Sequence, residues 1–170
     1  MIIKNALWSN IFKTDSNESS QTILALKQVP IFNGLSERDF NTVLKIVHNR
    51  EYELDEFIFR SGTPGLGMYI IIEGDVVIKG INPEGKNIEF ARLSSGEFFG
   101  EISLIGEDDR STNAMALSPC KLGAFFRSDL LDIITRSPKL GNKILLNLAI
   151  VLGNRLTKTN ELLIHGEMGK

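Results

Sequence analysis

Apolar residues in the middle of the chain recur at every second position, in short runs between turn residues. A period of two is typical of β-strands that bury one face. The predicted runs are Tyr52/Leu54, Phe57/Phe59, Tyr69 to Ile72, Val76/Ile78, Ile88/Phe90, Met115/Leu117 and Leu122/Ala124. Segments rich in Gly, Pro, Asn or Ser separate them at 61–67, 73–75, 82–86 and 94–97, where the backbone must turn sharply. Roughly eight short strands at this spacing predict a double-stranded β-helix of the jelly-roll type.

Helical periodicity flanks this β region on both sides. The segment from Ser36, SERDFNTVLKIV, has a Ser cap, acidic residues in the first turn and an apolar face that includes Phe40 and Val43. After Phe126 we expect a capped short helix that stops at Pro138, and then one long helix from Lys139 to Ile164. The fold class is therefore mainly β with flanking helices.

The long helix, at ~1.5 Å per residue, is longer than the barrel that it leans on. Its apolar residues fall into two groups, Leu145, Leu148, Leu152, Leu156 and Leu163 on one seam, and Leu146, Ala149, Ile150 and Gly153 on another face. One group can cover the barrel while the other packs against a second copy, which predicts a homodimer through residues 140–163. The alternative is a single broad face buried within a monomer.

The N-terminal region is expected to be a separate extension. Residues 13–21, KTDSNESSQ, are polar and predict a hinge. Before the hinge, Ile3, Leu7, Trp8 and Ile11 have near-helical spacing, so this segment either packs on the fold or binds a partner. We divide the chain into an extension and linker (1–28), a jelly roll (29–137) and a C-terminal helix that serves as lid or dimer contact, with its tail (138–170).

Composition narrows the range of functions. The chain has 170 residues, of which 42% are hydrophobic and 24% charged, as expected for one compact domain. A net charge of −2 argues against a protein whose main function is to bind DNA or an anionic membrane, but it permits a small basic pocket. One cysteine and two histidines are too few for a disulfide or a usual zinc site. With no apolar run long enough for a membrane span and no signal-peptide pattern, we expect a cytoplasmic protein without membrane contact.

The segment GEFFGEISLIGEDDRSTNAMAL, residues 96–117, interrupts the strand rhythm. It predicts a strand, a tight loop at Gly96 and Gly100, one helical turn from Glu101, and another strand. Free N–H groups at the start of that turn attract an anion, and Arg110 adds a positive charge with paired donors. A carboxylate such as Glu101 only accepts hydrogen bonds, so beside a phosphate it requires a donor such as a sugar hydroxyl. These features predict a pocket for one phosphate and a ribose.

FGEISL (99–104) and DRSTNA (109–114) strongly resemble the phosphate-binding cassette of the cyclic-nucleotide-binding domain family. The resemblance extends through the glycine-punctuated strands at 58–78 and covers about Val29 to Ile164. It implies a cyclic nucleotide as ligand, cAMP or alternatively cGMP, and no cofactor. It further implies that Glu101 binds the ribose 2′-hydroxyl and that Arg110 binds the cyclic phosphate. The same resemblance implies a frame of backbone amides and added hydroxyls around the phosphate, from Gly100, Ile102, Ser103, Ser111 and Thr112.

The end of the long helix, GNRLTKTNELL (153–163), is similar to the dimer helix of the bacterial catabolite-activator branch. In that branch the residues that match Thr159 and Asn160 contact the base. A helix-turn-helix domain follows there, whereas the sequence here ends at Lys170. We therefore expect no direct DNA binding, and a sensor that signals by rearranging its flanking helices to an effector protein of unknown identity.

One departure from the family pattern leaves an alternative open. The family commonly has proline before the arginine, whereas this chain has Asp108 and Asp109. If these carboxylates are exposed about 8 Å from a phosphate, each repels it by roughly 0.5 kcal/mol, less than the roughly 1.5–3 kcal/mol from one bond to Arg110. If instead Asp109 pairs with Arg110, the fold is a ligand-free interaction module. His48, His165 and Cys120 share no motif with each other, so we expect no enzymatic activity.

Overall fold

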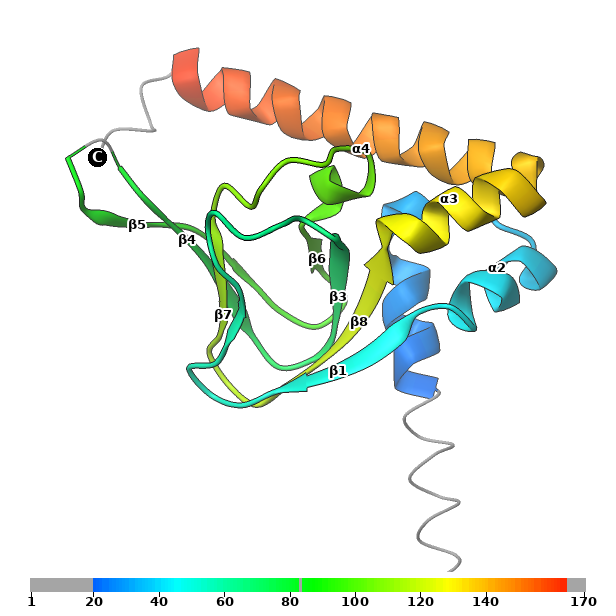
Figure 1. Cartoon of the computed structure of the whole chain (residues 1–170), viewed down its shortest axis with the longest axis horizontal. Coiled ribbons are helices and arrows are strands. Elements are labelled where there is room, and N and C mark those ends of the chain that lie inside the picture. The colour runs from blue at the N-terminus through cyan, green and yellow to red at the C-terminus, as the bar shows by residue number, and fades with distance from the viewer. Residues whose placement is uncertain (1–19, 83, 165–170) are drawn as a thin grey trace, which may run out of the picture.

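Two four-stranded antiparallel sheets form the β region of the chain, whose computed structural model describes residues 20–82 and 84–164 (Figure 1). The first sheet has the order β1-β8-β3-β6 and the second the order β2-β7-β4-β5. The strands are β1 (His48–Tyr52), β2 (Phe57–Phe59), β3 (Gly67–Glu73), β4 (Val76–Ile81), β5 (Asn87–Leu93), β6 (Phe98–Phe99), β7 (Asn113–Ala116) and β8 (Cys120–Phe126). The mainly β jelly roll with flanking helices that the sequence predicts is confirmed.

The central strands of the first sheet, β3 and β8, are buried on both faces, which explains the continuous apolar run of β3. Met68 and Ile70 point to a core shared with the helices, whereas Ile71 points to the interior between the two sheets. On β8, which pairs with β3, Phe125 joins the helical core and Leu122 the interior. Alternate residues of one strand thus serve two different cores, since successive side chains point to opposite faces.

The helices gather on the outer face of the first sheet. Residues 20–28 are helical, and η1 (Pro30–Phe32), α2 (Glu37–Leu44), α3 (Arg127–Arg136) and α4 (Pro138–Ile164) follow in chain order, with the short turn η2 (Glu101–Leu104) inserted between β6 and β7. Ser36 caps α2 as predicted, because its Oγ accepts from the backbone N–H of Asp39. Phe32 and Phe125 meet edge to face, with ring centroids 5.7 Å apart, at the junction of η1 and the sheet.

Several predicted boundaries differ from the observed ones. Ser20 and Gln21, expected in the hinge, are helical, while the rest of the hinge and the apolar segment before it lie outside the described residues. The strands span only residues 48–126, so residues 29–47 of the predicted jelly-roll unit contribute helices and turns. The polar strand β1 begins already at His48, and Leu54 lies exposed in the turn after it. Backbone pairing with β8 holds β1 in the sheet without an alternating apolar pattern.

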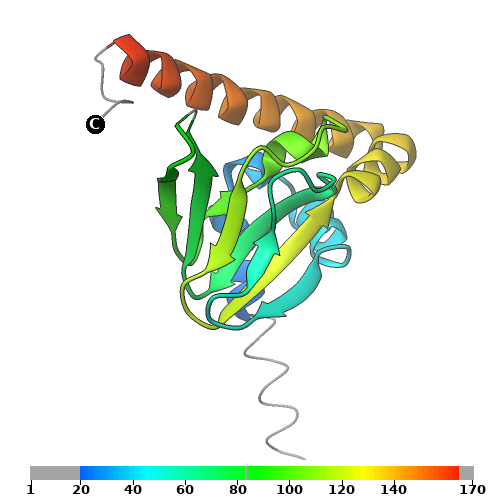
Figure 2. The same cartoon turned by 60° about the vertical axis from the view of Figure 1, so that its left-hand side comes forward.

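The long helix α4 crosses above the barrel, and in both views its C-terminal end lies on the side of the β4–β5 hairpin (Figures 1 and 2). Ile144, Leu148 and Val151 are buried against the other helices and the sheet. Leu156 and Leu163, which the sequence grouped with Leu148, are instead exposed. Rows of residues four apart turn by about 40° per step around a helix, so this row rotates away from the barrel.

The second apolar group on α4 remains uncovered in the single chain. Leu146 and Ile150 are 63% and 54% exposed, and Ala149 and Gly153 are exposed beside them. The alternative of a single broad buried face is therefore wrong for this chain. None of the helices in the described ranges has both the length and the hydropathy that a membrane span requires.

Candidate functional site

A cavity of about 340 Å³ opens between the second sheet, η2 and α4. Its volume lies within the usual range for small-molecule sites. One part is apolar, lined by Phe59, Ile78, Ala91, Leu93 and Phe99, and the opposite part is polar, lined by residues of the segment 100–112 and by Arg155. An apolar wall facing a compact set of charged and hydroxyl groups suits a ligand with a flat apolar part and an anionic part.

Gly100 shapes the polar end of the cavity. Its φ of 77° lies in the left-handed region, where a side chain is strained. A Cβ at this position would lie 2.6 Å from Nη1 of Arg110 and 3.3 Å from the carbonyl oxygen of Gly67. Glycine is therefore required both for the turn into η2 and for the close approach of the guanidinium.

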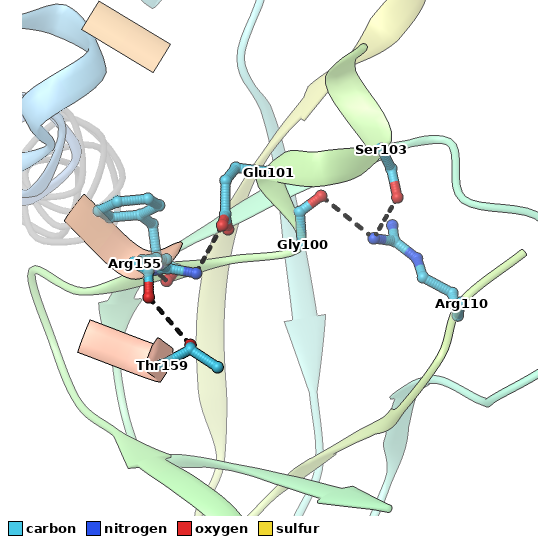
Figure 3. Close-up of polar contacts among 7 residues, drawn as sticks. Gly100, Glu101, Ser103, Arg110, Arg155 and Thr159 are labelled. Carbon is cyan, nitrogen blue, oxygen red and sulfur yellow. Dashed lines mark hydrogen bonds and ion pairs between the residues drawn. The ribbon is translucent and has the colours of Figure 1, made fainter. Parts of the chain in front are cut away.

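Arg110 is buried beneath η2 with 7% of its surface exposed. Its Nη2 donates to the Gly67 carbonyl at 2.6 Å. Its Nη1 donates to Oγ of Ser103 at 2.9 Å and to the Gly100 carbonyl at 3.3 Å (Figure 3). The guanidinium carbon lies 4.1 Å from the ring centroid of Phe59. Two strands and the helical turn thus fix one cation at the wall of the cavity.

The hydrogen bonding of Arg110 is incomplete. A guanidinium has five N–H donors, and the buried Nε has no partner among the described residues. Burial lowers the pKa of the Arg110 guanidinium, while the nearby Tyr69 and Glu101 raise it. An arginine nevertheless stays charged in a protein, so the site keeps a buried positive charge with spare donor capacity.

Backbone hydrogen bonds hold the loop that carries Arg110. The Arg110 N–H donates to the Thr63 carbonyl, and the Gly62 N–H donates to the Arg110 carbonyl, both at 2.8 Å. Asp109 forms an isolated antiparallel bridge with Pro64. The expected alternative, a pair between Asp109 and Arg110, does not occur in this structure: no carboxylate of the described residues forms a salt bridge with Arg110, whose acceptors are two carbonyls and one hydroxyl.

Glu101 is buried, with 2% of its surface exposed, and it is paired with α4. Its Oε1 accepts from Nη1 of Arg155 at 2.6 Å, and Figure 3 shows the two side chains pointing toward each other. Arg155 also donates from Nη2 to the Phe98 carbonyl at 3.2 Å and lies over the Phe98 ring at 4.9 Å. The ion pair joins the phosphate-binding segment that the sequence predicts to the long helix.

Seven of the nine predicted site residues line this one cavity: Gly100, Glu101, Ile102, Ser103, Arg110, Ser111 and Thr112. Thr159 and Asn160 do not line it; both are exposed on α4. Thr159 lies one turn beyond Arg155, and its hydroxyl donates to the Arg155 carbonyl at 2.9 Å (Figure 3). Contact of Thr159 or Asn160 with a base stays a prediction.

Arg155 is the site residue that our sequence reasoning missed. A charged residue in an otherwise polar helix end looks like a solvated one, and its side chain is indeed 49% exposed. A usable indication was present, however, because Arg155 precedes Thr159 by four residues and so shares its helix face. No group of three His, Cys, Asp or Glu residues in the described ranges is arranged to hold a metal ion.

Comparison with known proteins agrees with this geometry. The family model of the cyclic nucleotide-binding domain matches residues 49–137. The chain is 37% identical over 117 residues to a putative potassium channel protein of Rhodopseudomonas palustris, covering 69% of this chain and 28% of the relative. It is 33% identical over 135 residues to the cyclic AMP receptor protein of Thermus thermophilus, covering 79% and 61%. The chain thus spans less than two thirds of the length of either relative.

A solved structure extends the agreement to three dimensions. The crystal structure of Thermus thermophilus catabolite activator protein superposes with a TM-score of 0.73 at 32% identity, over 82% of this chain and 63% of that one. The family model and the Thermus thermophilus cyclic AMP receptor protein are those of cyclic nucleotide-binding regulators. With the buried Arg110, the glycine turn and the family match over the barrel, the chain belongs to the cyclic nucleotide-binding domain family.

Proposed function

We propose that this chain is a sensor of cyclic nucleotides that binds cAMP in the cavity between the second sheet and α4. The observation that carries the proposal is the buried Arg110 guanidinium, which lines the cavity and has two carbonyls and one hydroxyl as acceptors but no carboxylate partner among the described residues. A single cyclic phosphate in the cavity supplies the counter-charge that the guanidinium lacks. The similarity to the cyclic AMP receptor protein of Thermus thermophilus favours cAMP. The alternative ligand is cGMP, because Ser111, Thr159 and Asn160 can bond either base.

The other residues that line the cavity bind different parts of the nucleotide. The backbone of Gly100, Ile102 and Ser103 borders the phosphate, with the hydroxyls of Ser111 and Thr112 on its other side. Glu101 accepts from the ribose 2′-hydroxyl. The apolar wall of the cavity packs against the flat face of the base. Thr159 reaches the base if the C-terminal end of α4 moves toward the barrel.

The signal is a change in how α4 is held. Its first half is fixed to the η1 turn, since Lys143 donates to the Gly34 carbonyl and Asn147 donates to the carbonyls of Ile31 and Asn33 at 3.1 and 3.0 Å. Beyond Val151, every residue up to Ile164 is exposed or half-buried, and the ion pair of Arg155 with Glu101 links this part of α4 to the site. A ligand that bonds Glu101 therefore acts directly on the link that holds the second half of α4.

A thermal-shift titration with cAMP, with cGMP and with buffer alone tests the proposal. Ligand at 100 times its dissociation constant adds about 2.7 kcal/mol to the free energy of unfolding, which shifts the melting temperature by several degrees. We expect a saturable shift with cAMP. If neither nucleotide shifts the melting temperature at millimolar concentration, the sensor proposal is wrong and the chain is an interaction module of the same fold.

A further inference from the structure

The charged residues that line the cavity carry more negative than positive charge, which does not favour an anionic ligand. Arg110 and Arg155 contribute two positive charges, whereas Glu101, Asp108 and Asp109 contribute three negative ones. Arg155 and Glu101 neutralise each other through their ion pair. The phosphate position at the buried Arg110 therefore lies beside two exposed carboxylates, and neither Asp108 nor Asp109 forms a salt bridge among the described residues.

The backbone keeps these carboxylates beside the arginine. Asp109 immediately precedes Arg110 and is bridged to Pro64, while the Arg110 N–H donates to the Thr63 carbonyl at 2.8 Å. The carbonyl oxygen of Asp108 lies against Gly65, 2.9 Å from where a Cβ on that glycine would be. The backbone of the loop thus holds both aspartates next to Arg110, and moving that backbone away would break the contacts that position Arg110 itself.

Ligands of this cavity differ in charge as well as in shape. A cyclic phosphodiester carries one negative charge at neutral pH. A linear monophosphate carries about 1.5 to 2, because its second proton leaves with a pKa near 6. Repulsion by a fixed carboxylate grows in proportion to the charge of the ligand, so Asp108 and Asp109 oppose the linear nucleotide more strongly than the cyclic one.

We propose that Asp108 and Asp109 are specificity-determining residues that make this cavity discriminate against linear nucleoside monophosphates, the hydrolysis products of its cyclic ligand. This inference rests on the proposed function and adds to it a source of selectivity other than the shape of the ring. If each carboxylate lies about 8 Å from the phosphate in water, it lowers the affinity roughly 2.4-fold for each unit of ligand charge, so the pair contributes about fivefold to the discrimination. The effect weakens with salt, since 8 Å is about the Debye length at physiological ionic strength.

The double variant Asp108→Asn/Asp109→Asn tests this inference through the dissociation constants of cAMP and 5′-AMP, measured by calorimetry at low salt. We expect the ratio of the two constants, AMP over cAMP, to fall about fivefold relative to the unaltered protein. The control Glu53→Gln/Glu73→Gln makes the same change in net charge at two exposed residues that do not line the cavity, and it leaves the ratio unchanged. Asp109→Asn alone is expected to lower the ratio about twofold, and it serves if the double variant unfolds.

The pH of the titration separates charge from a purely structural effect. At pH 5 AMP carries close to one negative charge, as cAMP does, so the difference in the ratio between the variant and the unaltered protein disappears. A ratio that stays the same in the variant at pH 7, or falls equally in the control, overturns the inference while leaving cAMP binding intact. Failure of the unaltered protein to bind cAMP overturns the proposed function and this inference together.

Discussion

Arg110 combines burial with an unfinished set of hydrogen bonds. A buried charge is stabilised by good partners, and an N–H group without one lowers stability by roughly 1–3 kcal/mol. The three acceptors around Arg110 hold its position, and its Nε remains without a partner among the described residues. The buried, incompletely bonded guanidinium therefore lowers the stability of the ligand-free protein, and it provides a positioned positive charge for an anionic ligand.

Arg110→Ala is expected to weaken cAMP binding by about 2–4 kcal/mol in a calorimetric titration, because it removes the charged partner of the phosphate. Arg110→Lys keeps the charge but loses the forked geometry of the guanidinium. Its affinity for cAMP is therefore expected to lie between those of the unaltered protein and Arg110→Ala. Arg60→Ala is the matched control: Arg60 stacks on Phe57 at 3.5 Å and does not line the cavity. Unchanged affinity in Arg110→Ala would refute the assigned phosphate position.

Gly100 and Gly62 allow backbone strain to be separated from crowding. Both have a φ near 80°, 77° and 78°, but a Cβ at Gly62 meets nothing within 4 Å, whereas one at Gly100 meets Nη1 of Arg110. We expect Gly62→Ala to lower the free energy of unfolding by about 1–2 kcal/mol, the strain alone. Gly100→Ala should lower it by about 2–5 kcal/mol and also weaken cAMP binding. Equal losses of stability in denaturant titrations, with binding intact in both variants, would show that Gly100 does not position Arg110.

At the scale of elements, periodicity and turn residues predicted most of the strands, both C-terminal helices and the turn η2. These depend on local patterns: Ser36 caps α2, and Pro138 is the first residue of α4, just after the end of α3. The polar strand β1 was less predictable because its pairing with β8, not its own pattern, makes it a strand. Arg155 was missed for the same reason, since its partner Glu101 lies 54 residues away and only the folded chain brings them together.

The Glu101–Arg155 pair makes a testable link between the barrel and α4. Arg155→Ala leaves the buried Glu101 carboxylate without its guanidinium and should lower the free energy of unfolding by about 1–3 kcal/mol. Adding Glu101→Gln removes the unpaired charge, so the double variant should recover part of that loss. Chemical denaturation of the four proteins of this cycle gives the coupling energy. If the losses of the two single variants simply add, the pair does not hold α4 to the barrel.

At the scale of the whole molecule, the uncovered face of α4 has a regular pattern. Exposed residues recur at alternating steps of three and four along the helix: Leu146, Ala149, Gly153, Leu156, Asn160 and Leu163. This is the spacing of the two core positions of a coiled-coil heptad. Small residues at 149 and 153 permit close approach of a partner helix, and a polar residue such as Asn160 at a core position fixes the register of a pair. A second copy of α4 is the occupant that this pattern fits.

We therefore predict a homodimer through α4, which Leu156→Glu should dissociate. Leu156 is 63% exposed in the single chain, and its burial against a second copy would contribute roughly 1.5–3 kcal/mol, whereas a buried glutamate would oppose association. Light scattering at micromolar concentration should give twice the 18.9 kDa chain mass for the unaltered protein and the single mass for the variant. Asn154→Glu makes the same charge change about 160° away around the helix and should remain a dimer. A single-chain mass for the unaltered protein, with and without cAMP, would rule out this dimer. The exposed apolar face of α4 would then be a binding surface for a different protein.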